Sequence, residues 1–194
     1  MPKKKTKQVR SPFRSLIPII PAVALIALIV FLVTSPSQTP VGTTTATTAS
    51  QGGQAPDFTL KIINSDGLTQ QTFSLSTVQG RVIFMDFMHE WCVHCNNMAE
   101  TLDRLHQKYR DIVFFLTVAG SSNTTPEKTA DYLRRHGVSW TAVYDEGLDV
   151  FRRFGVRGTP TYFVISPSGV ILGKLEGEQP YTVLEQLIES ALKG

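Results

Sequence analysis

Cysteine is nearly absent from this 194-residue chain, which contains two cysteines and four histidines. So few cysteines exclude a fold held together by several disulfides, and they leave no second pair to complete a four-ligand structural zinc site. Both cysteines lie in the stretch HEWCVHC, at Cys92 and Cys95. Two cysteines three positions apart can form a redox couple or half of a metal site, and His94 between them keeps the metal alternative open.

Charge is missing from residues 16–54, and acidic side chains are missing from the whole chain before residue 55. The first 15 residues instead carry six basic side chains, at Lys3, Lys4, Lys5, Lys7, Arg10 and Arg14. Residues 55–194 hold thirteen basic and sixteen acidic residues, so the basic character of the chain belongs to its tail. A nucleic-acid-binding domain would carry the basic excess itself, and we therefore expect no nucleic-acid partner.

Residues 16–33, LIPIIPAVALIALIVFLV, form an uncharged and mostly apolar run that is long enough to cross a bilayer as one helix. A cleaved signal peptide is the alternative, but its apolar region is usually shorter and no A-x-A pattern follows here. We therefore predict a retained transmembrane helix. The basic residues 1–15 then form a cytoplasmic tail, and the rest of this single-pass membrane protein faces outward.

Residues 34–54 are rich in Thr, Ser, Gly and Pro, a composition that buries too little apolar surface to fold and is typical of a flexible linker. From residue 55 onward, short β-like runs alternate with helical ones, which predicts a single α/β domain over 55–194. It begins with a hairpin that turns at Asp66-Gly67. The further expected strands are 81–87, 112–118, 140–145, 161–166 and 169–175, and the expected helices follow Cys92 and cover 125–137, 147–154 and 183–192.

The apolar run RVIFMDF (81–87) predicts a buried central strand that leads directly to Cys92, where a helix is expected to begin. Unpaired N–H groups and the helix dipole favour an anion at such a terminus, so this position lowers the pKa of a cysteine. Cys95, one turn later, is close enough to form a disulfide. We therefore expect Cys92 to attack a partner disulfide and Cys95 to resolve the mixed disulfide, without a bound cofactor.

Residues 55–194 resemble the thioredoxin superfamily, and within it the membrane-anchored thiol–disulfide oxidoreductases of the TlpA/ResA type. The resemblance implies a thioredoxin-like fold, with a central mixed sheet flanked by helices and an N-terminal β-hairpin extension. It assigns Cys92 and Cys95 as the nucleophilic and resolving cysteines. The matching stretches occur in the family's order: APDFTL (55–60), MDFMHEWCVHC (85–95), FGVRGTPTYFVIS (154–166) and SGVILGKLEG (168–177).

The resemblance also implies roles for residues around the cysteines. Pro160 matches the proline whose preceding peptide bond is cis and which packs opposite the active site. The backbone of its neighbour Thr159 would pair with an extended substrate segment. Trp91 would form an apolar platform for partners, with packing alone as the alternative.

Asp86 lies six residues before Cys92, at the position where thioredoxins place a buried carboxylate. A buried carboxylate favours its neutral form, and it could carry the proton of Cys95 as the mixed disulfide resolves. The alternative is an acid at the end of a strand that points to water. His89 and Glu90 are expected on the solvated rim of the site.

The pair Val93-His94 differs from the Gly-Pro or Pro-Pro pair common in reducing members, and some strongly oxidising relatives carry histidine at the position of His94. A cation near Cys92 would stabilise the thiolate and make the protein a better oxidant, so His94 is expected to tune the redox potential.

We predict an extracytoplasmic enzyme that exchanges disulfides with protein thiols and works with a membrane redox partner. The reducing direction is favoured because the matching branch is mostly reducing. The alternatives are a disulfide oxidase or isomerase of the same fold, a metal-binding or metallochaperone module, a peroxidase, and a redox-inert binding module.

Overall fold

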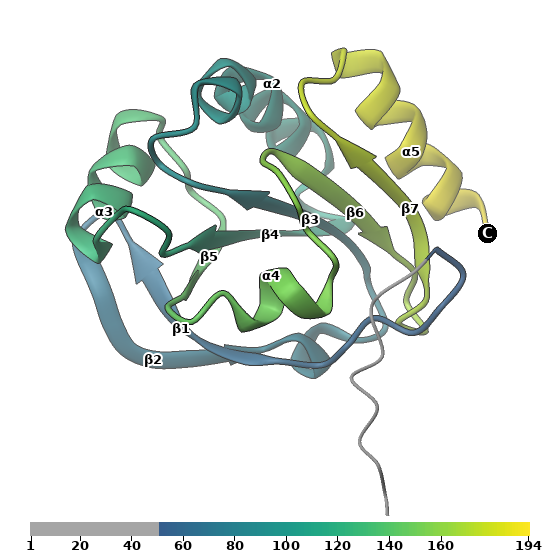
Figure 1. Cartoon of the computed structure of the whole chain (residues 1–194). Helices are drawn as coiled ribbons and strands as arrows, with labels where there is room; N and C mark the ends of the chain where they lie inside the picture. Colours follow the sequence, from purple (N-terminus) through teal and green to yellow (C-terminus); the bar gives the residue numbers. More distant parts are fainter. Residues whose placement is uncertain (1–50) are drawn as a thin grey trace, which may run out of the picture. The chain divides into compact units, whose positions relative to one another are not determined.

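A computed structural model of the chain describes residues 51–194 (Figure 1). The predicted cytoplasmic tail (1–15), transmembrane helix (16–33) and all but the last four residues of the predicted linker lie outside this range. None of the helices within residues 51–194 has the length and apolar character needed to cross a bilayer. Those last four linker residues lie along the edge of the sheet, where Gly52 N–H donates to the carbonyl of Ile171 at 2.8 Å.

A seven-stranded mixed sheet forms the centre of the described region, in the order β2-β1-β5-β4-β3-β6-β7. Neighbouring strands β3, β4 and β5 are parallel, and all other neighbours are antiparallel. This arrangement confirms the predicted mixed sheet. The strands are β1 (Thr59–Asn64), β2 (Gly67–Ser74), β3 (Val82–Met88), β4 (Val113–Gly120), β5 (Thr141–Asp145), β6 (Thr161–Ile165) and β7 (Ile171–Glu176).

The predicted N-terminal hairpin is formed by β1 and β2, and it extends the sheet beyond β5. Its tight turn places Asn64 opposite Gly67. Gly67 adopts a φ of 130°, a conformation that side chains disfavour, and the side chain of Asn64 accepts a hydrogen bond from Asp66 N–H at 2.9 Å. The turn predicted at Asp66-Gly67 is therefore confirmed to within one residue, because the two turn residues are Ser65 and Asp66 and Gly67 begins β2.

Helices cover both faces of the sheet (Figure 1). One face packs against α2 (Val93–Tyr109), α3 (Pro126–Arg135) and α5 (Tyr181–Lys193), and the other packs against α4 (Asp149–Arg153) and the short 3-10 helix η2 (Leu75–Val78). Every residue of β3 is buried, because both of its neighbours are strands and both of its faces are covered. Alternate side chains serve the two faces: Phe84 packs toward α2 and α5, and Phe87 packs toward α4.

The pairing of β3 with β6 determines where the cysteines lie. The two strands are antiparallel neighbours, with Phe87 opposite Thr161. The end of β3 and the start of β6 therefore meet at one edge of the sheet. The segment that follows β3 carries Cys92, and the segment that precedes β6 carries Thr159, so residues 67 positions apart come together there.

Candidate active site

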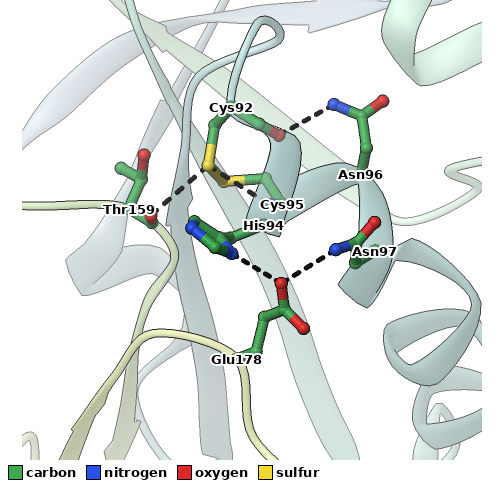
Figure 2. A network of polar contacts seen from close by, with 7 residues as sticks. All are labelled: Cys92, His94, Cys95, Asn96, Asn97, Thr159 and Glu178. Carbon is green, nitrogen blue, oxygen red and sulfur yellow. Dashed lines mark hydrogen bonds and ion pairs between the residues drawn. A yellow bond between two sulfur atoms is a disulfide. The ribbon is translucent and has the colours of Figure 1, made fainter.

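Cys92 is the N-cap residue of α2 and Cys95 lies in the first turn of that helix (Figure 2). Their sulfur atoms are joined in a disulfide, with 5.2 Å between the Cα atoms. The backbone N–H of Cys95 also donates to Sγ of Cys92, with 3.1 Å between nitrogen and sulfur. An N-cap acceptor satisfies one of the N–H groups that a helix leaves unpaired, and a thiolate would accept the same bond more strongly. The predicted start of the helix at Cys92 is confirmed.

The two cysteines differ in access, although both are mostly buried, with exposed fractions of 5% and 3%. Cys92 lines an open cavity of about 580 Å³, and Cys95 does not. A partner disulfide can therefore reach Cys92 first. This geometry fits the predicted order, in which Cys92 attacks and Cys95 resolves.

Thr159 and Pro160 face the disulfide from the segment before β6. The peptide bond between them is cis, as the resemblance implied. The carbonyl oxygen of Thr159 lies 3.3 Å from Sγ of Cys92, and Thr159 also lines the cavity. A chain segment that enters the cavity would meet this backbone and the attacking sulfur together.

Apolar side chains form most of the cavity wall, among them Trp91, Val93, Leu148, Phe151 and Val156. Trp91 is 49% exposed, and its indole N–H donates to the carbonyl of Ser122 at 2.6 Å. The hydrogen bond holds the ring at the rim with one part open to solvent, so packing alone does not account for Trp91. An exposed apolar ring at the rim of the cavity is what a platform for partners requires, and that role of Trp91 stays a prediction.

The prediction that His89 lies on the solvated rim is wrong, because its side chain is only 8% exposed. The imidazole packs against Trp91 and Phe151, with 5.0 Å between ring centroids in each case. Gly120, at the end of β4, makes room for it: a Cβ there would lie 2.6 Å from Nε2 of His89. Burial lowers the pKa of His89, so the imidazole is neutral at neutral pH. Glu90 is only half-buried, and it accepts a hydrogen bond from the hydroxyl of Thr124.

Asp86 is 4% exposed, which excludes the alternative of an acid that points to water. It lies on β3 between Thr117 of β4 and Tyr162 of β6, its partners in register. The hydroxyl of Thr117 donates to the carboxylate at 2.7 Å, and the indole N–H of Trp140 donates to that hydroxyl at 2.9 Å. Burial raises the pKa of Asp86 to about 7, and the bond from Thr117 opposes this rise.

Two buried tyrosines, one beside Cys95 and one beside Asp86, were not anticipated from the sequence. The hydroxyl of Tyr132, on α3, donates to the carbonyl of Cys95 at 3.1 Å. Tyr162 is fully buried opposite Asp86. Burial and the charge of Asp86 raise the pKa of both hydroxyls, so they stay protonated near Asp86. An alternating strand pattern could place Tyr162 on one face, but the pairing of Tyr162 with Asp86 is not visible in the sequence.

His94 projects from the first turn of α2 toward the loop after β7 (Figure 2). Its Nδ1 lies 2.6 Å from Oε1 of Glu178, and the side-chain amide of Asn97 donates to the same oxygen at 2.8 Å. These hydrogen bonds lower the pKa of Glu178. Glu178 was missed because it lies 84 residues from His94 in the sequence. Within residues 51–194, no group of three or more histidine, cysteine or acidic side chains is arranged to hold a metal ion.

Comparisons with known proteins agree with the fold and the cysteine pair described above. The profile of the AhpC/TSA family matches residues 51–173. The thiol-disulfide oxidoreductase ResA of Bacillus thuringiensis subsp. konkukian is 22% identical over 138 residues, which cover 71% of this chain and 76% of ResA. Protein SUPPRESSOR OF QUENCHING 1 of Arabidopsis thaliana is 29% identical over 119 residues, which cover 59% of this chain but only 11% of that much longer protein.

Among solved structures, a protein assigned as the thiol:disulfide interchange protein DsbE of Chlorobium tepidum superposes with a TM-score of 0.67 at 27% identity. The superposition covers 75% of this chain and 99% of the other. This likeness confirms the predicted thioredoxin-like fold.

Replacing the buried carboxyl of Asp86 is expected to change how stability depends on pH. The pKa rises from 3.8 to about 7 on folding, so the folded protein holds the proton more tightly than the unfolded chain. The carboxyl therefore contributes stability that is complete below pH 3.8 and is lost as the pH rises through about 7. Above that pH, the ionised carboxyl lowers the free energy of unfolding by up to about 4 kcal/mol relative to the protonated form. This figure follows from about 1.4 kcal/mol per pKa unit.

We expect Asp86→Asn to raise the free energy of unfolding at pH 8 by about 1–4 kcal/mol and to have much less effect near pH 4. Denaturant unfolding of the oxidised protein at the two pH values measures this difference. Glu100→Gln, which removes an exposed acid of α2, is the control. A variant that gains nothing at pH 8 relative to pH 4 would contradict the burial argument.

Proposed function

We propose a function for this chain, which belongs to the AhpC/TSA family: it is a protein thiol–disulfide oxidoreductase of the TlpA/ResA type that acts as a reductase outside the cytoplasm. The observation that carries the activity is the placement of the two sulfur atoms. Cys92 and Cys95 form a disulfide at the start of α2, and only Cys92 lines the cavity bordered by Thr159. The thiol–disulfide oxidoreductase relative and the DsbE-like structure support the same chemistry.

The reaction follows from that placement. In the reduced enzyme, the thiolate of Cys92 attacks one sulfur of a partner disulfide. The partner's S–S bond breaks, its other sulfur leaves as a thiolate that takes up a proton, and a mixed disulfide forms. Cys95 then loses its proton and attacks Sγ of Cys92, which releases the second partner thiol. Two electrons have passed to the partner, and the enzyme holds the Cys92–Cys95 disulfide.

Asp86 is proposed as the group that takes the proton of Cys95. Its carboxyl lies on the face of the sheet that α2 covers, in the same strand as Met88, which belongs to the same buried cluster as both cysteines. Its pKa of about 7 allows it to take up and release a proton near neutral pH. Tyr132 and Tyr162, whose hydroxyls stay protonated, would leave Asp86 as the acid–base group of this buried cluster.

The reducing direction is supported by the environment of His94. An imidazolium that acted on Cys92 alone would stabilise the thiolate and favour an oxidant. Here Nδ1 of His94 lies 2.6 Å from the carboxylate of Glu178. The negative charge of that carboxylate would offset a positive charge on the ring. We infer that His94 tunes the potential by less than an unpaired histidine would. The sequence resemblance to a mostly reducing branch points the same way.

We propose that residues 16–33 anchor the protein in a membrane, with residues 1–15 in the cytoplasm, residues 34–50 as a linker and the enzyme domain outside, since residues 51–54 pair with the edge of the sheet. The basic tail and the uncharged apolar run support this topology. Once oxidised, the enzyme needs a dithiol reductant to start another cycle. A membrane protein that carries electrons across the bilayer is the partner proposed to supply it.

The redox potential of the Cys92–Cys95 couple tests the proposed direction. We expect a single two-electron transition close to the potential of a reductase, about −270 mV, rather than that of a strong oxidant, about −120 mV. Equilibration of the full chain with dithiol buffers, read out by alkylation of free thiols, gives this value. A potential near that of the oxidant would reverse the assigned direction and leave the chemistry intact.

The proposed anchor predicts that the full chain remains in the membrane fraction after alkaline extraction, because a retained apolar helix is not removed by high pH. Deletion of residues 16–33 is expected to release the protein. Protease added outside intact spheroplasts should digest the enzyme domain. Recovery of a soluble form that lacks the first 33 residues would instead identify the segment as a cleaved signal peptide.

A further inference from the structure

The cavity beside Cys92 has an unusual distribution of charge. Of its lining side chains, Arg152, Arg157 and the histidines can carry a positive charge, and none is acidic. His89 is neutral at neutral pH because its burial lowers the pKa. The charge that the cavity presents to a partner therefore depends on His94 and the two arginines.

Two of these three side chains have a carboxylate partner that lies outside the cavity lining. His94 pairs with Glu178. Arg152 pairs with Asp149 and also donates to the carbonyl of Gly147. Arg157 is exposed, and within residues 51–194 it makes neither an ion pair nor a side-chain hydrogen bond. No acidic residue precedes residue 55 in the sequence, so the rest of the chain offers it no carboxylate.

The position of Arg157 relates this charge to the reacting sulfur. Arg157 precedes Thr159 by two residues, and two residues of chain span at most about 7 Å. The carbonyl of Thr159 lies 3.3 Å from Sγ of Cys92. A substrate segment that runs past Thr159 with its cysteine at Cys92 would therefore place a residue about two positions from that cysteine beside the guanidinium.

We propose that Arg157 is a specificity-determining residue, which selects substrate segments that carry an acidic residue two positions from the reacting cysteine. The segment would also carry an apolar residue next to that cysteine, because Trp91 and Val93 are 49% and 68% exposed at the rim. Guanidinium groups match carboxylates with paired hydrogen bonds, which gives direction as well as attraction. This inference rests on the proposed thiol–disulfide function and names the substrate class for it.

The expected preference is modest. Arg157 is exposed, and an ion pair between exposed groups contributes little because water screens it. A preference of about threefold to fivefold in half-saturation is therefore expected, with little change in the limiting rate. Added salt should reduce it, since the pair is open to solvent.

Short peptides provide the test. Each peptide carries one cysteine capped as a disulfide with 2-mercaptoethanol, a leucine next to the cysteine, and Glu, Gln or Lys two positions away on one side or the other. The reduced full chain is mixed with each peptide under single-turnover conditions, and the freed peptide thiol is quantified by chromatography. The concentration dependence separates half-saturation from the limiting rate. The variants are Arg157→Gln, Arg157→Glu and, as a control at the far end of α2, Arg110→Gln.

We expect the wild-type chain and Arg110→Gln to favour the Glu peptide over the Gln peptide, and both over the Lys peptide, for one placement of the charge. Arg157→Gln should remove the preference, and Arg157→Glu should reverse it. Equal half-saturation for all peptides in the wild-type chain, or a preference that survives in both Arg157 variants, would overturn the proposal. Failure to reduce any peptide would overturn the thiol–disulfide function, and this inference with it.

Discussion

The antiparallel pairing of β3 with β6 is the constraint on which the site depends. It brings the segment after β3 and the segment before β6 to one edge of the sheet, so that Cys92 and Thr159 meet across 67 residues of sequence. Every residue of β3 is buried, so packing on both faces holds this strand in place. The first turn of α2 then offers its N–H groups to Cys92, and the cavity leaves this sulfur, and not that of Cys95, open to a partner.

Different kinds of side chain lie on the two sides of the disulfide. Outside, Trp91, Val93 and Thr159 border an apolar cavity in which a partner segment can lie. Beneath, Asp86, Tyr132 and Tyr162 form a buried cluster whose one acidic member titrates near neutral pH. The proposed docking surface and the proposed proton acceptor therefore consist of different residues, so a change on the surface is expected to alter partner choice without altering the buried acid.

Local patterns made much of this predictable. The apolar run before Cys92, the Asp-Gly turn and the capped helix after Thr125 each determine their own structure within a few residues. The family resemblance placed Thr159 and Pro160 opposite Cys92, but the other contacts between distant residues were not predictable. His89 is buried because Gly120, on a neighbouring strand, leaves space for its ring. Glu178 reaches His94 only because the loop after β7 passes beside α2. One sequence carries no signal for such pairs.

Covalent capture of a partner tests the central claim most directly. The account predicts that the reduced Cys95→Ser chain, mixed with a disulfide-bonded protein, accumulates a mixed disulfide through Cys92 that dithiothreitol releases, because the resolving sulfur is missing. The matched Cys92→Ser chain should form little or none, since Cys95 does not line the cavity. Absence of the adduct in Cys95→Ser, or equal adduct in both variants, would contradict the assigned roles of the two cysteines.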